Sequence, residues 1–393
     1  MTPLERLPVL QVLAQSSEED ALQEHLEALR EADQSFGQVG RALVFLARDE
    51  CRLALELLDP IEADSLPAQW QEQVTYIKGH ALLSLGENEN ALKVFSAWAQ
   101  GSGDSPEALV GKSKALMRLR RLEEAEPVLR ALVSKDENNF DGQFGLGVLL
   151  TATRRYSESL DHLARAQALN PLAEGPYRAL CQLFTVLEQP KEGVEFLKGI
   201  LQMGFLLNSP AVLMDLIELH QAAGIDEGLD NYLNIVERTA DLGPAEVMEL
   251  GRCWYELRRP EELKRLAGRM NAENGGVEEG MAKLLNGLAI HLEGESQRAA
   301  IPLAEAAELA PSLWLTYERL AALALEMGDS DRARDYVSEA LKRAPHQPDT
   351  RVMEGIVQIK VDPDSEARSF LEHISRSQGV RAVLRERAKA ALQ

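Results

Sequence analysis

The chain has 393 residues, of which 45% are hydrophobic and only 5% aromatic. It carries 42 lysines and arginines against 63 aspartates and glutamates, a net charge of −21. Nucleic acid and anionic membranes repel so acidic a chain, so we expect it to bind neither. Its length would allow two or three globular domains, unless the sequence proves repetitive.

The cysteines and the first residues indicate in which cellular compartment the protein is found. Cys51, Cys181 and Cys253 lie more than seventy residues apart without CxxC spacing, which predicts neither a disulfide nor a zinc site. Each is expected to be a small buried side chain. Charged residues and a proline interrupt the apolar run in residues 1–15, so it is a poor secretory signal, and no later segment has 18 consecutive apolar residues. We therefore expect a cytoplasmic protein.

Residues 140–173 are the clearest copy of a unit that organises the chain. Apolar residues recur at helical spacing before Thr153 and again after it, up to Pro171, which cannot continue a helix. Gly147 and Ser159 are small, as residues must be where two helices cross closely. The pattern predicts a helix–turn–helix hairpin.

The same unit recurs at intervals of about 34 residues. Copies are expected at 2–34, 35–71, 72–105, 106–139, 140–173, 174–207, 210–243, 244–279, 280–313, 314–347 and 348–379. Small residues at the eighth and twentieth places and proline at the thirty-second resemble the tetratricopeptide repeat. The resemblance implies an all-α fold, a right-handed α-solenoid of about ten helix-turn-helix repeats with a C-terminal capping helix.

The segments differ in character along the chain. Residues 1–71 are expected to be degenerate helical repeats that form an acidic N-terminal cap, since a polar end repeat stops further stacking. Residues 72–207 are expected to hold repeats with a basic middle groove, 208–279 diverged repeats and 280–379 further regular repeats. Residues 380–393 are expected to form the capping helix.

Three helix starts support this register. Proline follows Ser105, Ser209 and Gly243, and proline is favoured at the first residue of a helix. Extra residues beyond the 34-residue period are expected in the connections at 203–209 and 271–279.

The expected capping helix is basic on one side, with Arg381, Arg385, Arg387 and Lys389. These side chains can be read as a nucleic-acid or membrane contact. We prefer a simpler interpretation, in which basic residues near the carboxyl end of a helix offset its dipole.

No catalytic or metal-binding pattern is present in the sequence. The seven histidines are dispersed and form no HExxH motif, and Gly145-Leu146-Gly147 lacks the third glycine of a dinucleotide-binding loop. Phosphate-binding loops and nucleophile elbows are also missing. We therefore predict that the chain is not an enzyme and binds neither a metal ion nor a cofactor.

The resemblance implies that the first helix of each repeat lines a concave groove for a partner protein. The groove residues are then expected to be Tyr76, His80, Lys114, Arg118, Phe144, Val148, Arg178 and Gln182. Cations around an apolar floor suit an acidic peptide with hydrophobic anchors. The carboxylate clamp of the chaperone-binding members is not matched, because Gly145 and Val148 stand where that clamp needs Asn or Lys.

The distribution of charge also favours the middle segment as a binding region. Residues 106–171 hold ten basic and nine acidic side chains, a near balance in a strongly acidic chain. Two arginine pairs lie one period apart and are expected to form an edge for an acidic partner: Arg120, Arg121, Arg154 and Arg155. The alternative is that these arginines are hydrated and pair with neighbouring acids.

The carboxy-terminal half holds a second candidate surface. Four apolar residues of one first helix occupy groove-facing as well as core places: Met281, Leu284, Leu285 and Leu288. They predict either packing between repeats, the commoner use of such a stripe, or an apolar groove for a partner helix.

The sequence thus favours a non-catalytic cytoplasmic adaptor or scaffold that holds a peptide or helix of another protein, with an acidic peptide as one candidate. The alternative is a regulatory or targeting subunit of an enzyme or of a secretion or polysaccharide apparatus. A monomer is favoured over a homo-oligomer, because the acidic first repeat and the closing helix disfavour stacking of exposed ends.

Overall fold

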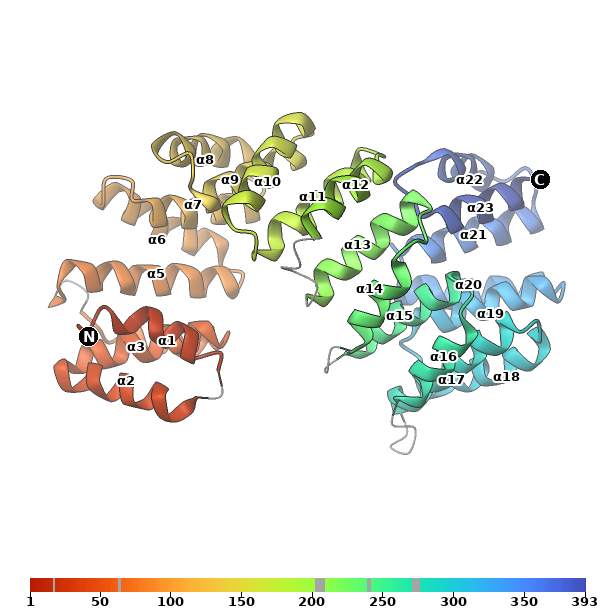
Figure 1. Ribbon diagram of the computed structural model, residues 1–393, viewed down its shortest axis with the longest axis horizontal. Coiled ribbons are helices and arrows are strands. Elements are labelled where there is room, and N and C mark those ends of the chain that lie inside the picture. The colour runs from red at the N-terminus through yellow and green to blue at the C-terminus, as the bar shows by residue number, and fades with distance from the viewer. Residues whose placement is uncertain (17, 63–64, 202–208, 239–241, 271–275) are drawn as a thin grey trace. The chain divides into compact units, whose positions relative to one another are not determined.

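The computed structural model describes residues 1–16, 18–62, 65–201, 209–238, 242–270 and 276–393. These residues form helices and turns without a strand (Figure 1), which confirms the all-α prediction. Most of the connection expected at 203–209 and the first half of the one at 271–279 lie outside the described residues. None of the helices that the structure describes is both long and apolar enough to cross a bilayer.

The chain divides into two compact units, Met1–Pro171 and Leu172–Gln393, named here the N-terminal and the C-terminal unit. The N-terminal unit contains α1 (Arg6–Leu13), α2 (Glu19–Ala32), α3 (Gln34–Ala47), α4 (Cys51–Leu58), α5 (Ala68–Ser84), α6 (Asn88–Gly101), α7 (Pro106–Arg118), α8 (Leu122–Lys135), α9 (Phe140–Ala152) and α10 (Tyr156–Leu169). The boundaries expected at residues 71, 207, 279 and 379 do not coincide with this division.

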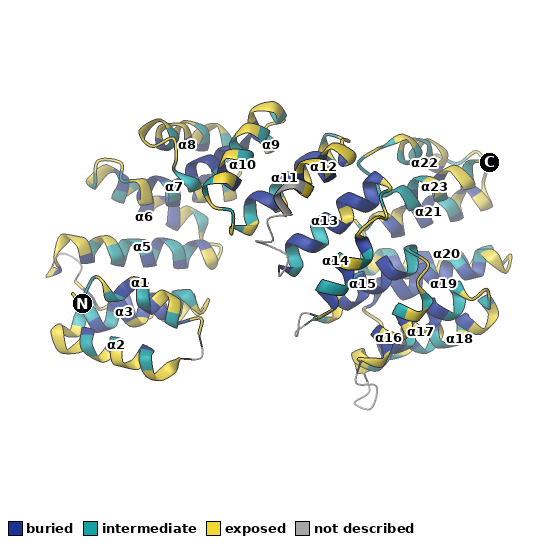
Figure 2. Ribbon diagram, viewed as in Figure 1, coloured by how far each residue is buried: buried dark blue, intermediate teal, exposed yellow. Residues whose placement is uncertain are grey.

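The C-terminal unit contains α11 (Glu174–Val186), α12 (Pro190–Leu201), α13 (Pro210–Ala223), α14 (Leu229–Arg238), α15 (Pro244–Glu256), α16 (Pro260–Gly268), α17 (Gly276–Leu292), α18 (Ser296–Leu309), α19 (Trp314–Glu326), α20 (Ser330–Arg343), α21 (Pro348–Val361), α22 (Ala367–Arg376) and α23 (Ala382–Leu392). In both units consecutive helices pack as hairpins, and buried residues line the faces where helices meet (Figure 2).

The hairpin α9–α10 shows why small residues are needed at a crossing. A Cβ added to Gly147 would lie 2.6 Å from Leu163 Cγ, closer than atoms can approach. The Ser159 hydroxyl donates a hydrogen bond of 2.7 Å to the carbonyl oxygen of Gly147. The two residues that the sequence places at the crossing therefore meet there.

The three proline starts are also confirmed. α7, α13 and α15 begin at Pro106, Pro210 and Pro244. The hydroxyls of Ser105 and Ser209 accept hydrogen bonds from the backbone N–H groups of Ala108 and Val212, which caps α7 and α13.

The apolar stripe of α17 is core and not surface. Met281, Leu284, Leu285 and Leu288 are each at most 1% exposed and belong to the core cluster of the C-terminal unit. The prediction of an apolar binding groove at these residues is therefore wrong. Neighbouring helices cover them, because α17 packs against α15, α16 and α18.

Candidate functional site

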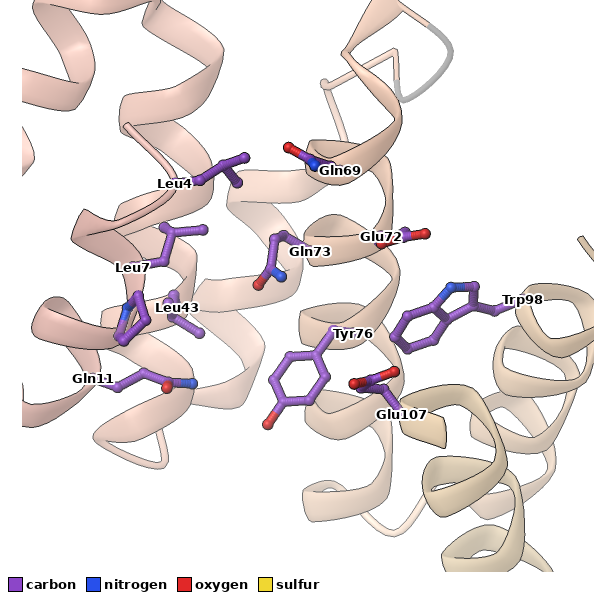
Figure 3. Close-up of a pocket in the computed structure, with 11 residues that line it drawn as sticks. Leu4, Leu7, Gln11, Leu43, Gln69, Glu72, Gln73, Tyr76, Trp98 and Glu107 are labelled. Atoms are coloured by element: carbon purple, nitrogen blue, oxygen red, sulfur yellow. The ribbon is translucent and has the colours of Figure 1, made fainter. Parts of the chain in front are cut away.

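A groove in the N-terminal unit runs between α1, α3 and α5, and we call it the N-terminal groove (Figure 3). One hollow of about 480 Å³ is lined by Leu4, Leu7, Pro8, Gln11, Leu43, Gln69, Glu72, Gln73, Tyr76, Trp98 and Glu107. A second hollow of about 510 Å³ is lined by Gln11, Val12, Gln15, Leu43, Leu46, Ala47, Tyr76, His80 and Ser84. The two share Gln11, Leu43 and Tyr76 and are therefore continuous.

One face of α5 supplies the floor. Gln69, Gln73, Tyr76 and His80 recur at intervals of three or four residues, which places them on the same side of a helix. In Figure 3, Gln73 and Tyr76 point from α5 toward Leu7 and Gln11. Of the expected groove residues, Tyr76 and His80 thus line the hollow in the structure.

Aromatic rings fix the middle of this floor. The rings of Tyr76 and His80 are tilted against each other at 4.4 Å, and the His80 ring meets Phe95 edge-on at 5.3 Å. Burial, and after it the positive charge of Lys114, lowers the pKa of His80 to about 4. His80 is therefore neutral at physiological pH and offers a hydrogen-bonding ring rather than a charge.

Four glutamine side chains distinguish this groove: Gln11, Gln15, Gln69 and Gln73. A carboxamide both donates and accepts hydrogen bonds, as the backbone of an extended peptide does. The buried indole N–H of Trp98, another lining residue, has no hydrogen-bond partner in the described part of the chain. Apart from Glu72 and Glu107, the lining thus consists of aromatic rings and apolar side chains between uncharged polar groups.

Charge is unevenly distributed along the groove. Glu72 and Glu107 line it near the first turns of α5 and α7. Lys114 and Arg118 lie farther along α7. Glu72 and Glu107 therefore make one end of the groove acidic, whereas Lys114 and Arg118 lie outside its lining, close enough for their charges to act on His80.

The charges of Lys114 and Arg118 are partly neutralised or engaged. Lys114 Nζ lies 3.1 Å from Asp141 Oδ1, and an Arg118 Nη1–H donates to the carbonyl oxygen of Leu83. Both side chains remain exposed. The expected cationic groove is therefore less basic than the residue types alone indicate.

The remaining expected groove residues fall on other helices. Phe144 and Val148 lie half-buried on α9, where the Phe144 ring stacks on Phe140 with centroids 6.0 Å apart. Arg178 and Gln182 are exposed on α11, which belongs to the C-terminal unit. The Nε of Arg178 pairs with Asp215 Oδ2 at 2.6 Å.

Two of the four arginines expected to form an edge for a partner instead pair with glutamates of the same unit. Arg121 Nε lies 2.7 Å from Glu124 Oε1, and Arg155 Nη1 lies 2.6 Å from Glu126 Oε1 in the preceding hairpin. For Arg121 and Arg155 the alternative of pairing with neighbouring acids is confirmed. Arg120 and Arg154 are exposed in the turns, with φ of 60° and 61°.

The C-terminal unit contains a charged cluster that the sequence reading missed. Its members come from the first helices α15, α19 and α21, and we call them the inner cluster: Arg252, Glu256, Glu318, Arg319 and Asp349. Arg252 lies 2.6 Å from Glu249 and 3.0 Å from Glu256, and Arg319 pairs with Glu318.

The helix α23 and its N-cap residue, Arg381, complete the inner cluster. Arg381 pairs with both Glu256 and Asp349, and Arg387 Nη2 lies 2.7 Å from Glu318 Oε1. Burial raises the pKa of Glu256 to about 7 and also raises that of Asp349. Although burial opposes ionisation of Glu318 as well, Arg319 and Arg387 hold its pKa below the ordinary value.

A sequence signal for this cluster was available. Counted within their repeats, Asp349, Glu318, Arg252 and Glu256 occupy the second, fifth, ninth and thirteenth places. The expected groove residues on α7, α9 and α11 occupy the fifth, ninth and thirteenth places of theirs. Applying one register to every repeat would have marked Glu318, Arg252 and Glu256 as groove-facing, but not Asp349.

The basic residues of α23 therefore do more than offset a helix dipole. Besides the ion pairs of Arg381 and Arg387, Arg385 Nη1 donates to the carbonyl oxygen of Ala222 in α13 at 3.0 Å. Leu384 and Ala388 are fully buried against α21 and α22, as expected of a cap.

Comparison with known proteins identifies the repeat. Residues 110–174 match the model of the tetratricopeptide repeat family. No curated protein matches the chain. Proteins built from these repeats generally mediate protein–protein interactions and are generally not catalysts.

Several solved structures are similar. The pilF protein of Pseudomonas aeruginosa is 14% identical with a TM-score of 0.41, covering 71% of this chain and 94% of its own. A tetratricopeptide repeat protein of Parabacteroides merdae is 15% identical with a TM-score of 0.43, covering 73% and 99%. The APC/C hetero-tetramer Cut9–Hcn1 is 12% identical with a TM-score of 0.40, covering 84% and 64%. The family match shows tetratricopeptide repeat sequence in residues 110–174, and helical hairpins recur through the described residues of both units.

Proposed function

We propose that this chain is an adaptor that holds an extended segment of a partner protein in the N-terminal groove. The single observation that carries the proposal is the lining of that groove, where glutamine amides alternate with Tyr76, Trp98 and leucine side chains. Amides can pair with the backbone of any extended segment, and the apolar surfaces between them can hold its side chains.

The two ends of the groove give the segment a direction. Glu72 and Glu107 favour a lysine or arginine at one end. Lys114 and Arg118, exposed beyond the lining near His80, favour an acidic side chain where the segment leaves the other end. The acidic partner expected from the sequence thus becomes, in this proposal, a segment with opposite charges at its two ends. The role is non-catalytic and set in the cytoplasm.

A selection from displayed random linear peptides, made on the full chain, tests the proposal. Peptides retained by the unaltered chain are expected to be lost from the Gln73→Ala/Tyr76→Ala variant and kept by Gln100→Ala, which changes an exposed glutamine outside the groove. Circular dichroism first establishes that the variants are equally helical.

Charge reversal tests the direction. Glu72→Lys/Glu107→Lys is expected to replace the basic residue of the selected peptides by an acidic one, at that end only. The matched control, Glu56→Lys/Glu123→Lys, changes two exposed glutamates that do not line the groove. Peptides that bind equally well to the groove variants and to the controls would contradict the proposal.

A further inference from the structure

The inner face of the C-terminal unit is covered by a helix of the same chain. The long-range polar contacts of α23 all reach the first helices of repeats: Arg385 contacts α13, Arg381 contacts α15 and α21, and Arg387 contacts α19. In tetratricopeptide repeats these first helices are the ones that line the groove. The segment before α23 also reaches back, because the Ser377 hydroxyl donates to Glu188 Oε1 at 2.7 Å.

Burial of α19 shows how completely this face is covered. Every residue from Leu313 to Ala321 is buried, including both charged members of the inner cluster on α19. A first helix of a solenoid is covered by its neighbours on the sides but faces the groove on the inside. By contrast, α7 keeps Lys114 and Arg118 exposed on its groove side. On α19 the inner-cluster residues are therefore covered, and α23 contributes to that cover through Arg387, which pairs with Glu318.

The chemistry of this face defines what can bind there. Glu249, Glu256, Glu318 and Asp349 outnumber Arg252 and Arg319, so the face without α23 carries an excess of carboxylates. Two of these, Glu318 and Asp349, are fully buried. A buried carboxylate requires a cation beside it, which Arg381 and Arg387 supply.

α23 is attached through apolar contacts with α21 and α22 as well as through its arginines. Only Leu384 and Ala388 of this helix are buried as core, and its other apolar residues remain partly accessible. Buried ion pairs contribute specificity more than net stability, because desolvation of both ions opposes their attraction. Another helix with the same arrangement of arginines would exchange equivalent contacts for those of α23.

We propose that the inner face of the C-terminal unit is a second protein-binding surface, that α23 is its internal ligand, and that its external ligand is a basic amphipathic helix of a partner protein. Such a helix carries arginines at the spacing of Arg381, Arg385 and Arg387, with an apolar stripe like that of Leu384 and Ala388. It enters by displacing α23. The surface is independent of the N-terminal groove.

The test uses the full chain and a fluorescent synthetic peptide of residues 377–393 as the probe. In Arg381→Glu/Arg387→Glu, α23 is expected to leave the face, so that amides of residues 382–392 exchange rapidly with solvent while the remaining helices stay protected. The peptide is then expected to bind this variant at least about tenfold more tightly than the unaltered chain, whose face is occupied.

Two controls separate the specific contact from net charge. Arg376→Glu/Lys389→Glu makes the same charge change at exposed residues and is expected to bind no more peptide than the unaltered chain. A peptide with glutamate in place of Arg381 and Arg387 is expected not to bind. If the released variant binds both peptides equally, or neither, the proposal is overturned.

A measurement on the unaltered chain decides the matter if the variant fails to fold. Excess peptide 377–393 is expected to accelerate exchange at residues 382–392, and the charge-reversed peptide is expected to leave it unchanged. Unchanged exchange with both peptides means that α23 is a fixed part of the core and overturns the proposal. In the Gln73→Ala/Tyr76→Ala variant the peptide should accelerate this exchange as much as in the unaltered chain. The test therefore distinguishes failure of this proposal from failure of the proposal for the N-terminal groove.

Discussion

Arg387 Nη2 lies 2.7 Å from the buried Glu318 Oε1, although 69 residues separate the two along the chain. Glu318 is fully buried, so the contact removes a carboxylate from water and supplies a guanidinium in return. A contact of this kind cannot come from neighbouring repeats alone. It shows that the C-terminal unit is held together by its ends as well as by nearest-neighbour packing.

Removing this guanidinium is expected to destabilise the C-terminal unit. Arg387→Ala leaves Glu318 buried with Arg319 as its remaining cation, and breaking such a buried pair is expected to cost about 2 to 3 kcal/mol. Hydrogen exchange of the α19 amides reports the loss within this unit. Lys389→Ala is the control, since Lys389 pairs with Glu386 on the exposed side of the same helix and should change the exchange little. Equal effects of the two substitutions would refute the assignment.

The carboxyl of Glu256 is expected to make stability fall as the pH rises. Burial raises its pKa from 4.5 to about 7, so between these values the folded unit holds a proton that the unfolded chain has lost. The contribution is fully present below pH 4.5 and is lost as the pH rises through about 7. Asp349, whose pKa is also raised by burial, acts in the same direction.

Glu256→Gln isolates this effect. The variant cannot titrate, so its free energy of unfolding should fall less than that of the unaltered chain between about pH 5 and about pH 8. Urea titrations at the two pH values measure the difference, and carboxyls common to both proteins cancel. A steeper fall in the variant would show that the ion pair with Arg381 outweighs the cost of burying the charge.

The close contact of Gly111 with Phe95 predicts a large effect from one methyl group. A Cβ at Gly111 would lie 2.2 Å from Phe95 Cε1, so Gly111→Ala must displace the ring and is expected to cost about 1 to 3 kcal/mol. Gly101→Ala places the same methyl on a helix with nothing within 4 Å and is expected to stabilise by up to about 1 kcal/mol. Thermal unfolding should show shifts of opposite sign, and shifts of the same sign would mean that packing at Phe95 is not the cause.

The turns inside the hairpins predict a stabilising substitution. Arg120 has φ of 60°, a backbone conformation that is unfavourable for residues other than glycine. Arg120→Gly is therefore expected to stabilise the unit by about 0.5 to 1 kcal/mol. Gly86 has φ of 79° in the preceding hairpin, and Gly86→Ala is expected to destabilise by about the same amount. Unfolding in urea compares the two, and a destabilised Arg120→Gly would instead point to a contact of its side chain.

The helical hairpins were predictable because their rules are local. Gly147 and Ser159 are small for a reason that acts within one repeat, and the structure brings them into contact. The sequence could not show whether the apolar stripe that includes Leu284 is core or surface. Periodicity shows which residues share a face of a helix but not whether another helix covers that face.

The inner cluster was only partly predictable. The repeat register marks Glu256 and Glu318 as groove-facing, but nothing in a 34-residue period pairs them with a helix some 69 to 125 residues away. Long-range ion pairs depend on how the repeats curve over the whole unit. That curvature arises from small rotations between neighbouring repeats, which single residues do not reveal.

The contacts of the segment before α23 and of α23 itself also affect how the protein folds. Repeat arrays ordinarily fold from any point outward, because each contact joins neighbours. In the C-terminal unit the contact between Ser377 and Glu188 spans 189 residues and that between Arg385 and Ala222 spans 163. Closing loops of this length is slow, so this unit should acquire its final structure later than the N-terminal unit and lose it in one cooperative step rather than repeat by repeat.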